Sequence, residues 1–141
     1  MPDVRQPATS QAMAVASTAL KAQQARMRVI AENIANANST SATKGGDPYR
    51  RKVPVFEPMK IDSQTQGVRM KGSNPDQTPF KTEYEPGHPS ADDKGYVKMP
   101  NVDNLIEALD MREAQRAYEA NLNVIETARS LQMRTLELLK R

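Results

Sequence analysis

Cysteine and tryptophan are absent from the 141 residues of this chain, and histidine occurs only once. Without cysteine the chain can form no disulfide and has no thiolate to act as a nucleophile or metal ligand. The single histidine, His88, excludes a multi-histidine metal site, and its place between Gly87 and Pro89 indicates a surface turn. We therefore expect no metal ion and no histidine-based catalysis.

The motifs of common enzyme sites are missing as well. No glycine-rich phosphate-binding motif occurs in the chain. Asp92 and Asp93 lie in SADDKG, which lacks the alternating oxygen ligands and final glutamate of a calcium loop, so a solvated acidic turn is favoured. The sequence thus predicts a protein that is not an enzyme and binds no cofactor.

Long apolar runs and strong charge are also lacking. No segment approaches the roughly 20 apolar residues that cross a bilayer, and residues 1–27 lack the apolar stretch of a cleaved secretion signal. The net charge is only +3, and the longest run of like charge is Arg50, Arg51 and Lys52. We expect no membrane insertion and no nucleic-acid partner, and any export of the chain would have to leave it uncleaved.

Glycine and proline are concentrated in the middle of the chain. All six glycines and eight of the ten prolines lie between Gly45 and Pro100. The flanks are therefore free to form long helices, over residues 8 to about 37 and 102 to about 139. Asn101 or Asp103 can cap the second helix, and Glu107 suits the positive end of its dipole. We expect three segments: an N-terminal helix in 1–44, an insert in 45–100 and a C-terminal helix in 101–141.

The first helical flank contains a repeat of seven residues. The a positions are Met13, Leu20, Met27 and Ile34, and the d positions, three residues later, are Ala16, Gln23, Ile30 and Ala37. Alanine and glutamine occupy three of these eight positions, so the apolar seam is weak. Such a helix is marginal alone and needs a partner.

The last flank has a broader apolar surface. One stripe holds Tyr118, Leu122, Ile125, Leu136 and Leu139, and a neighbouring stripe holds Val124, Ala128, Leu131 and Leu138. This width exceeds what one antiparallel helix covers, so either other subunits or a longer interface within one fold must bury it.

The middle segment predicts short strands and turns. YRRKVPVFEPMKI and GVRMKG have the composition of short or edge strands, whereas SNPDQTP and EPGHPSADDKG are rich in turn residues. A small, irregular, β-containing insert is expected.

The stretch ENIANANST closes the first helix with an unusual number of amides. It resembles the N-terminal signature of bacterial flagellar rod, hook and hook-associated proteins, an asparagine-rich helix end followed by serine or threonine. The matching residues are Asn33, Ile34, Ala35, Asn36, Ala37, Asn38 and Thr40.

Three further stretches extend the resemblance over most of the chain: residues 47–58, 84–103 and 114–138. Together they are similar to the flagellar basal-body rod family and, within it, to proximal-rod subunits. The resemblance implies a mainly α fold, in which long N- and C-terminal helices pair as an antiparallel coiled-coil-like hairpin with a small β-containing insert between them.

The same resemblance implies a role and partners. It implies a structural subunit of the periplasmic drive shaft, which transmits torque for motility. The chain would polymerise with further copies of itself and other rod proteins. It would also meet the inner-membrane ring, rod-base adaptor proteins and the flagellar type III export apparatus, through which it would pass without a cleaved signal.

We expect subunit packing to use the helix stripes and the asparagine-rich end. These positions are Met13, Leu20, Met27, Ile30, Asn33, Ile34, Asn36, Asn38, Tyr118, Asn121, Leu122, Ile125, Ala128, Leu131, Leu136 and Leu139. In this hypothesis Asn33, Asn36 and Asn38 end the first helix and bond neighbouring segments, because a buried amide that loses its partners costs about 1–3 kcal/mol. Helix capping without intermolecular contacts is the alternative.

Two other functions fit parts of the sequence. A cytoplasmic coiled-coil adaptor or export chaperone could use the same stripes to bind a client helix, and it would form a stable helical dimer in dilute solution. A nucleic-acid-binding protein is supported only by the net charge and the basic run at Arg50, and its affinity would fall steeply with salt.

Overall fold

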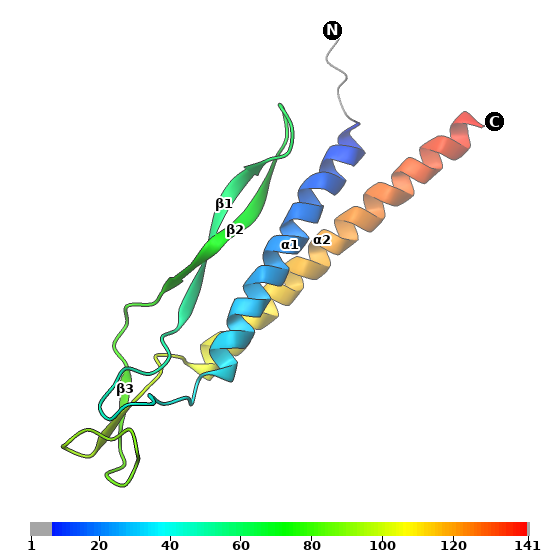
Figure 1. Ribbon diagram of the computed structural model, residues 1–141. Helices are drawn as coiled ribbons and strands as arrows, with labels where there is room; N and C mark the ends of the chain where they lie inside the picture. The colour runs from blue at the N-terminus through cyan, green and yellow to red at the C-terminus, as the bar shows by residue number, and fades with distance from the viewer. Residues whose placement is uncertain (1–6, 141) are drawn as a thin grey trace. The chain divides into compact units, whose positions relative to one another are not determined.

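The computed structural model describes residues 7–140. In chain order its elements are α1 (Ala8–Ala35), β1 (Lys52–Lys60), β2 (Gln66–Pro75), β3 (Lys81–Tyr84), β4 (Tyr96–Met99) and α2 (Asn104–Leu139) (Figure 1). The two helices occupy the flanks that lack glycine, within about two residues of the expected bounds. Because Asp103 Oδ1 accepts the N–H of Leu105 at 2.9 Å, Asp103 and not Asn101 caps α2.

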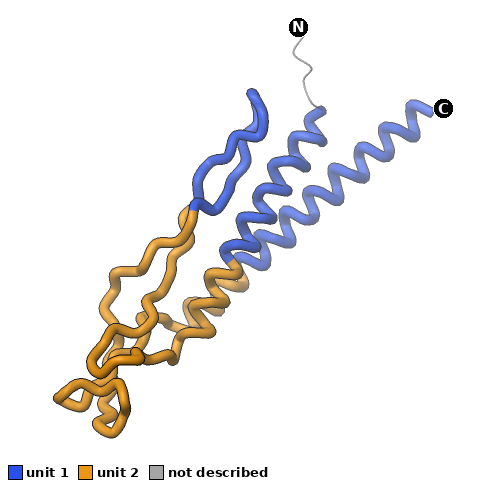
Figure 2. Tube along the Cα trace, viewed as in Figure 1, with its two compact units in different colours: residues 1–26, 56–71, 113–141 blue, residues 27–55, 72–112 orange. Residues whose placement is uncertain are grey.

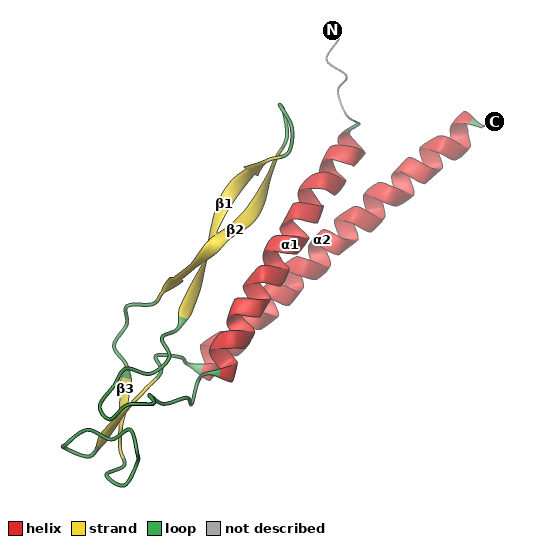
Figure 3. Cartoon of the chain, viewed as in Figure 1, coloured by secondary structure: helices red, strands yellow, loops and turns green. Residues whose placement is uncertain are grey.

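The prediction of a mainly α, coiled-coil-like fold was wrong. Four strands of 9, 10, 4 and 4 residues accompany the helices and form two separate two-stranded sheets, β1–β2 and β3–β4 (Figure 3). The fold therefore combines helices with sheets, and coiled-coil pairing of α1 with α2 is not shown.

The buried face of α1 differs from the face that the heptad pattern predicts. Ile34, at a predicted seam position, is 40% exposed, whereas its neighbour Asn33 is 1% exposed. Ala22 and Val29 are buried although they lie outside the seam. The heptad rule assumes one partner helix, but α1 also meets β2, where Thr18 Oγ1 accepts the N–H of Val68 at 3.1 Å.

The chain divides into two compact units (Figure 2). Unit 1 contains residues 1–26, 56–71 and 113–141, and unit 2 contains residues 27–55 and 72–112. Each unit therefore receives part of both helices and part of the β1–β2 hairpin.

In unit 1 the two helix segments run antiparallel and side by side. Arg26 lies 3.4 Å from Glu113, and Gln132 Nε2 donates to Thr9 Oγ1 at 3.2 Å and to Ser10 Oγ at 3.0 Å. In the described part of this unit, every buried hydrophobic residue is an alanine: Ala16, Ala22, Ala114 and Ala128. The helix segments therefore approach closely at these alanines, whereas larger side chains such as Leu20 and Ile125 are only half-buried.

The β1–β2 hairpin turns at residues 61–65. Asp62 Oδ1 accepts the backbone N–H groups of Gln64 and Thr65, each at 2.8 Å. Beyond the turn, a Cβ atom on Gly67 would lie only 2.3 Å from Thr18 Oγ1. The glycine therefore permits the close approach of β2 to α1 that the Thr18 hydrogen bond requires.

Unit 2 has a more varied core. The β3 and β4 strands pair antiparallel, with Lys81 opposite Met99 and Tyr84 opposite Tyr96, and Val97 is almost fully buried. The connecting loop ends at Gly95, whose φ of 88° is strained for other residues. This hairpin precedes the loop that leads into α2 and places Asn101 in the polar cluster described below.

Candidate functional site

The described residues contain no group of three or more His, Cys, Asp or Glu side chains that could hold a metal ion. Nor does any helix in residues 7–140 combine the length and apolar character needed to cross a membrane. His88 Nδ1 accepts the backbone N–H of Ser90 at 3.0 Å, so it stabilises its own turn. The features that stand out are instead an apolar surface in unit 1 and a buried polar cluster in unit 2.

The apolar surface follows the C-terminal part of α2. Leu136 and Leu139 are 59% and 77% exposed, and Leu122, Val124, Leu131, Met133 and Leu138 are exposed as well. Large side chains on a helix are normally covered in a stable fold. This surface is therefore available to another chain.

The end of α2 extends past the start of α1. Gln132 is bonded to Thr9 and Ser10 in the first turn of α1, and α2 continues for seven more residues, to Leu139. These residues include Met133, Leu136 and Leu138, which are 57%, 59% and 69% exposed and lie beyond the first turn of α1.

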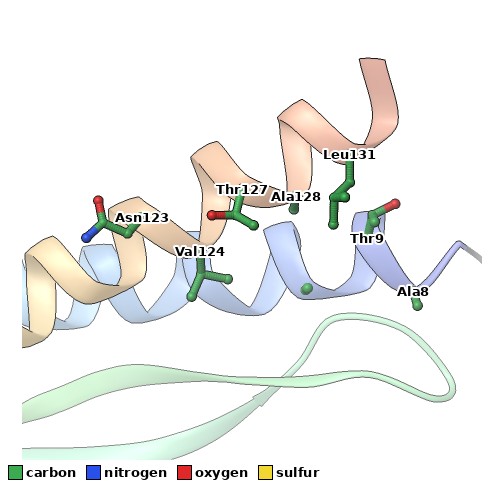
Figure 4. A pocket seen from close by; sticks show the side chains of 8 residues that line it. Ala8, Thr9, Asn123, Val124, Thr127, Ala128 and Leu131 are labelled. Atoms are coloured by element: carbon green, nitrogen blue, oxygen red, sulfur yellow. The ribbon is translucent and has the colours of Figure 1, made fainter. Parts of the chain in front are cut away.

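A shallow groove lies between the two helices near the same end (Figure 4). It has a volume of about 430 Å³ and is almost entirely apolar; its lining residues are Ala8, Thr9, Ala12, Asn123, Val124, Thr127, Ala128 and Leu131. Small residues on α1 leave this space open beside Val124 and Leu131. The groove has room for a few aliphatic side chains and offers almost no hydrogen bonds.

The polar cluster in unit 2 is built around Asn33 in the last turns of α1. Its Oδ1 accepts the N–H of Lys52 at 2.9 Å and the hydroxyl of Tyr49 at 2.7 Å. Its Nδ2 donates to the C=O of Lys52 at 2.9 Å and to Glu107 Oε2 at 3.4 Å. We call the two bonds to the Lys52 backbone the Asn33 clamp. Since an amide offers two donors and two acceptor positions, Asn33 is satisfied within the chain.

Tyr49, whose hydroxyl donates to Asn33, has a shifted pKa. Its pKa is raised to about 12, chiefly because burial disfavours the phenolate and also because the carboxylates of Glu32 and Glu107 lie nearby. Tyr49 therefore stays protonated and keeps donating to Asn33 at any physiological pH.

Arg51 and Glu107 form the charged half of the cluster. Glu107 in the first turn of α2 is fully buried, and its Oε1 accepts a hydrogen bond from Arg51 Nε. Arg51 also lies 3.2 Å from Asp76 and 3.4 Å from Asp110. Burial alone would lower the pKa of Arg51, but the bond and charge of Glu107, followed by those of Asp76, raise it overall. Arg51 and Glu107 therefore form a hydrogen-bonded ion pair that holds their two chain segments together.

Asn101 links the same cluster to the loop after β2. Its Oδ1 accepts the N–H of Arg51 at 2.7 Å, and its Nδ2 donates to the carbonyls of Asp76 and Thr78 at 3.0 and 3.1 Å. The backbone N–H of Thr78 is the main cause of the lowered pKa of Asp76. Sequence reasoning missed Asn101 as a cluster residue and considered it only as a helix cap.

The predicted subunit-packing residues fall into three groups. Ile30, Asn33 and Ala128 are buried within the chain; Met13, Leu20, Met27, Asn36, Tyr118, Asn121 and Ile125 are half-buried; Ile34, Asn38, Leu122, Leu131, Leu136 and Leu139 are exposed. The amides of Asn36 and Asn121 donate to carbonyls four residues earlier, those of Glu32 and Ala117, at 2.9 and 2.8 Å. Packing between subunits stays a prediction for all these positions, and the exposed group is the one free to make it.

Comparisons with known proteins cover both ends of the chain. A family model described as flagella basal body rod protein matches residues 13–42, and one described as flagellar basal body rod FlgEFG protein C-terminal matches residues 93–138. The first match includes the predicted N-terminal seam and the Asn33 region. The second includes all of α2 except its last residue.

Curated relatives match over nearly the whole chain. Proteins named flagellar basal-body rod protein FlgC are 49% identical in Agrobacterium fabrum, over 93% of this chain and 95% of the relative, and 44% identical in Salmonella typhimurium, over 88% and 92%. The FlgC protein of Aquifex aeolicus is 35% identical over 92% and 96%. These proteins are named for a structural part of the cell and not for a reaction.

Proposed function

Because this chain belongs to the flagellar basal-body rod protein family, as a structural subunit of the proximal rod, we propose that it holds neighbouring rod subunits through the exposed apolar surface of α2. The sequence-based expectation of this family is confirmed, and with it assembly with other rod proteins. The residues that make the contacts are our proposal.

The observation that carries the proposal is the contrast between what unit 1 buries and what it exposes. Every fully buried hydrophobic residue in its described part is an alanine, whereas the leucines of its α2 segment are exposed. Burial of apolar surface contributes about 25 cal/mol per Å², so covering several exposed leucines stabilises the assembled state. Polymerisation therefore adds stabilisation that this part of the isolated chain lacks.

Torque transmission follows from the same contacts. A shaft transmits torque only if each subunit resists sliding past the next, and packed aliphatic side chains resist it because protein interiors are dense and nearly incompressible. The groove beside Val124 and Leu131 gives a neighbour's side chains a place to interlock. No bound cofactor or catalytic step is needed for this role.

The cellular setting in this proposal rests on family membership alone. The subunit acts in the periplasmic part of the basal body after export through the flagellar type III apparatus without a cleaved signal. At the base of the shaft its neighbours include the inner-membrane ring and the rod-base adaptor proteins.

The test uses two substitutions in the exposed surface, Leu136→Asp and Leu139→Asp, introduced together in cells that lack the wild-type chain. The proposal predicts that the variant is exported but missing from purified hook and basal-body complexes, and that the cells do not swim. Ser130→Asp, an exposed polar position on the same helix, is the matched control and should assemble normally. Normal incorporation of the double variant would contradict the proposal.

A further inference from the structure

The outer edge of β1 is identified by the hydrogen bonds at the two ends of the hairpin. Ile61 N–H donates to Thr65 C=O at 3.0 Å, and Asp76 N–H donates to Arg51 C=O at 2.8 Å. Between these two hydrogen bonds, β1 advances by ten residues, from Arg51 to Ile61, and β2 by eleven, from Thr65 to Asp76. The hairpin therefore has one unpaired extra residue, a bulge, and it lies in β2. Backbone groups alternate along a strand. Odd-numbered residues of β1 therefore face β2, and even-numbered residues face outward.

The outward positions of β1 are Lys52, Pro54, Phe56, Pro58 and Lys60. The N–H and C=O of Lys52 are occupied by the Asn33 clamp. Pro54 and Pro58 have no N–H to donate. Three of the five outward positions therefore cannot donate to an added strand, and Phe56 stands between two prolines.

An outward group of β2 is also occupied. Thr65 C=O faces β1, so Val68, three residues later, faces outward, and its N–H donates to Thr18 Oγ1 at 3.1 Å. Helix α1 thus takes up outward strand groups with two polar side chains, Thr18 within unit 1 and Asn33 within unit 2. A two-stranded sheet without such protection presents unpaired backbone groups to other chains.

We propose that Pro54 and Pro58, together with the Asn33 clamp, close the outer edge of β1 against strand pairing with a second copy of this chain. The segment VPVFEPM is otherwise rich in residues that favour strands and exposes Phe56. With this edge closed, copies brought together at high concentration meet through helix surfaces and do not join sheet to sheet.

The experiment compares the purified full-length chain with the double variant Pro54→Val, Pro58→Val. Regaining two outward N–H donors should speed the appearance of thioflavin T fluorescence and of the infrared band of intermolecular β-structure about tenfold. Pro79→Val, which replaces a loop proline by the same residue, is the matched control and should behave as the wild type. Equal rates for the double variant and the wild type would overturn the proposal.

A rescue variant separates edge closure from simple misfolding. Adding Phe56→Pro to the double variant removes the N–H at the central outward position while keeping both valines. Because one outward N–H donor is removed and the run of donors is interrupted, edge closure predicts a slower rate than that of the double variant. A rate equal to that of the double variant would overturn the proposal. Both measurements use purified protein, so their results do not depend on whether α2 makes the proposed contacts in the rod.

Discussion

Arg51 and Glu107, 56 residues apart in the sequence, are joined by a hydrogen-bonded ion pair that links the residue just before β1 to the first turn of α2. Glu107 has no exposed surface, and Arg51 gathers Asp76 and Asp110 around the same guanidinium. The pair therefore joins three separate chain segments of unit 2 at one point.

The first prediction concerns this ion pair. Glu107→Gln keeps the shape of the side chain but removes its charge, leaving Arg51 without its most buried partner. Breaking a buried pair from one side should lower the free energy of unfolding by about 3 kcal/mol. Urea unfolding followed by tyrosine fluorescence suits the measurement, because Tyr49, Tyr84 and Tyr96 lie in unit 2. Glu137→Gln, on an exposed turn of α2, should change stability by less than about 0.5 kcal/mol. Similar values for both variants would show that the pair contributes nothing.

The second prediction concerns the Asn33 clamp. Asn33→Leu leaves the part-buried N–H and C=O of Lys52 without their partner and should cost about 2 kcal/mol. Asn36→Leu is the control, since the Asn36 amide bonds only to the Glu32 carbonyl within α1. If both variants unfold at the same urea concentration, the clamp has no special role. If only Asn33→Leu unfolds at a lower urea concentration, weakened folding of the monomer explains a motility defect in that variant.

The third prediction is loss of stability at alkaline pH through Tyr49. Its pKa in the folded chain, about 12, lies above the ordinary value of 10.0. The hydroxyl therefore contributes stability that is fully present below pH 10 and is lost as pH rises towards 12. Tyr49→Phe should show a flatter decline in unfolding free energy over this range. In the wild type, the absorbance of tyrosinate should include a late step near pH 12 that this variant lacks, whereas Tyr84→Phe should retain it.

The fourth prediction is acid sensitivity through Asp76. The N–H of Thr78 is the main cause that lowers its pKa below the ordinary 3.8, with further help from the Thr78 hydroxyl and Arg51 against the opposing effect of burial. The ionised carboxylate thus stabilises the fold above pH 4, and this contribution is lost as pH falls through the lower folded pKa. Asp76→Asn should reduce the difference in stability between pH 6 and pH 2. An unchanged difference, equal to that of the exposed control Asp93→Asn, would contradict this role.

The positions of the helices and of the first hairpin could be predicted because their signals are local. Glycine and proline delimit α1 and α2, and the residues around Val53 and Phe56 have strand composition. The strands β3 and β4 were missed, since four residues are too few to show alternation and every residue of β3 is exposed. Their pairing depends on the loop between them, which the sequence marks only as turns.

The candidate site was predicted only in part, for a different reason. Exposed leucines on α2 follow from the width of its apolar stripe, but Glu107 looked like an ordinary residue near a helix start. Its burial depends on Arg51, and no pattern within one helix contains that partner. Likewise, the amide of Asn33 indicates a polar contact without indicating whether Lys52 or another chain supplies it.

The alanine contact between the helices of unit 1 has a mechanical consequence. Alanine has no side-chain rotamers, so closing this contact freezes almost no side-chain entropy and also gains little from burial. The alanine positions therefore contribute little rigidity to the pair of helix segments in a single chain. A shaft made of such subunits takes its stiffness from the number of chains packed around each helix and not from the rigidity of any one of them.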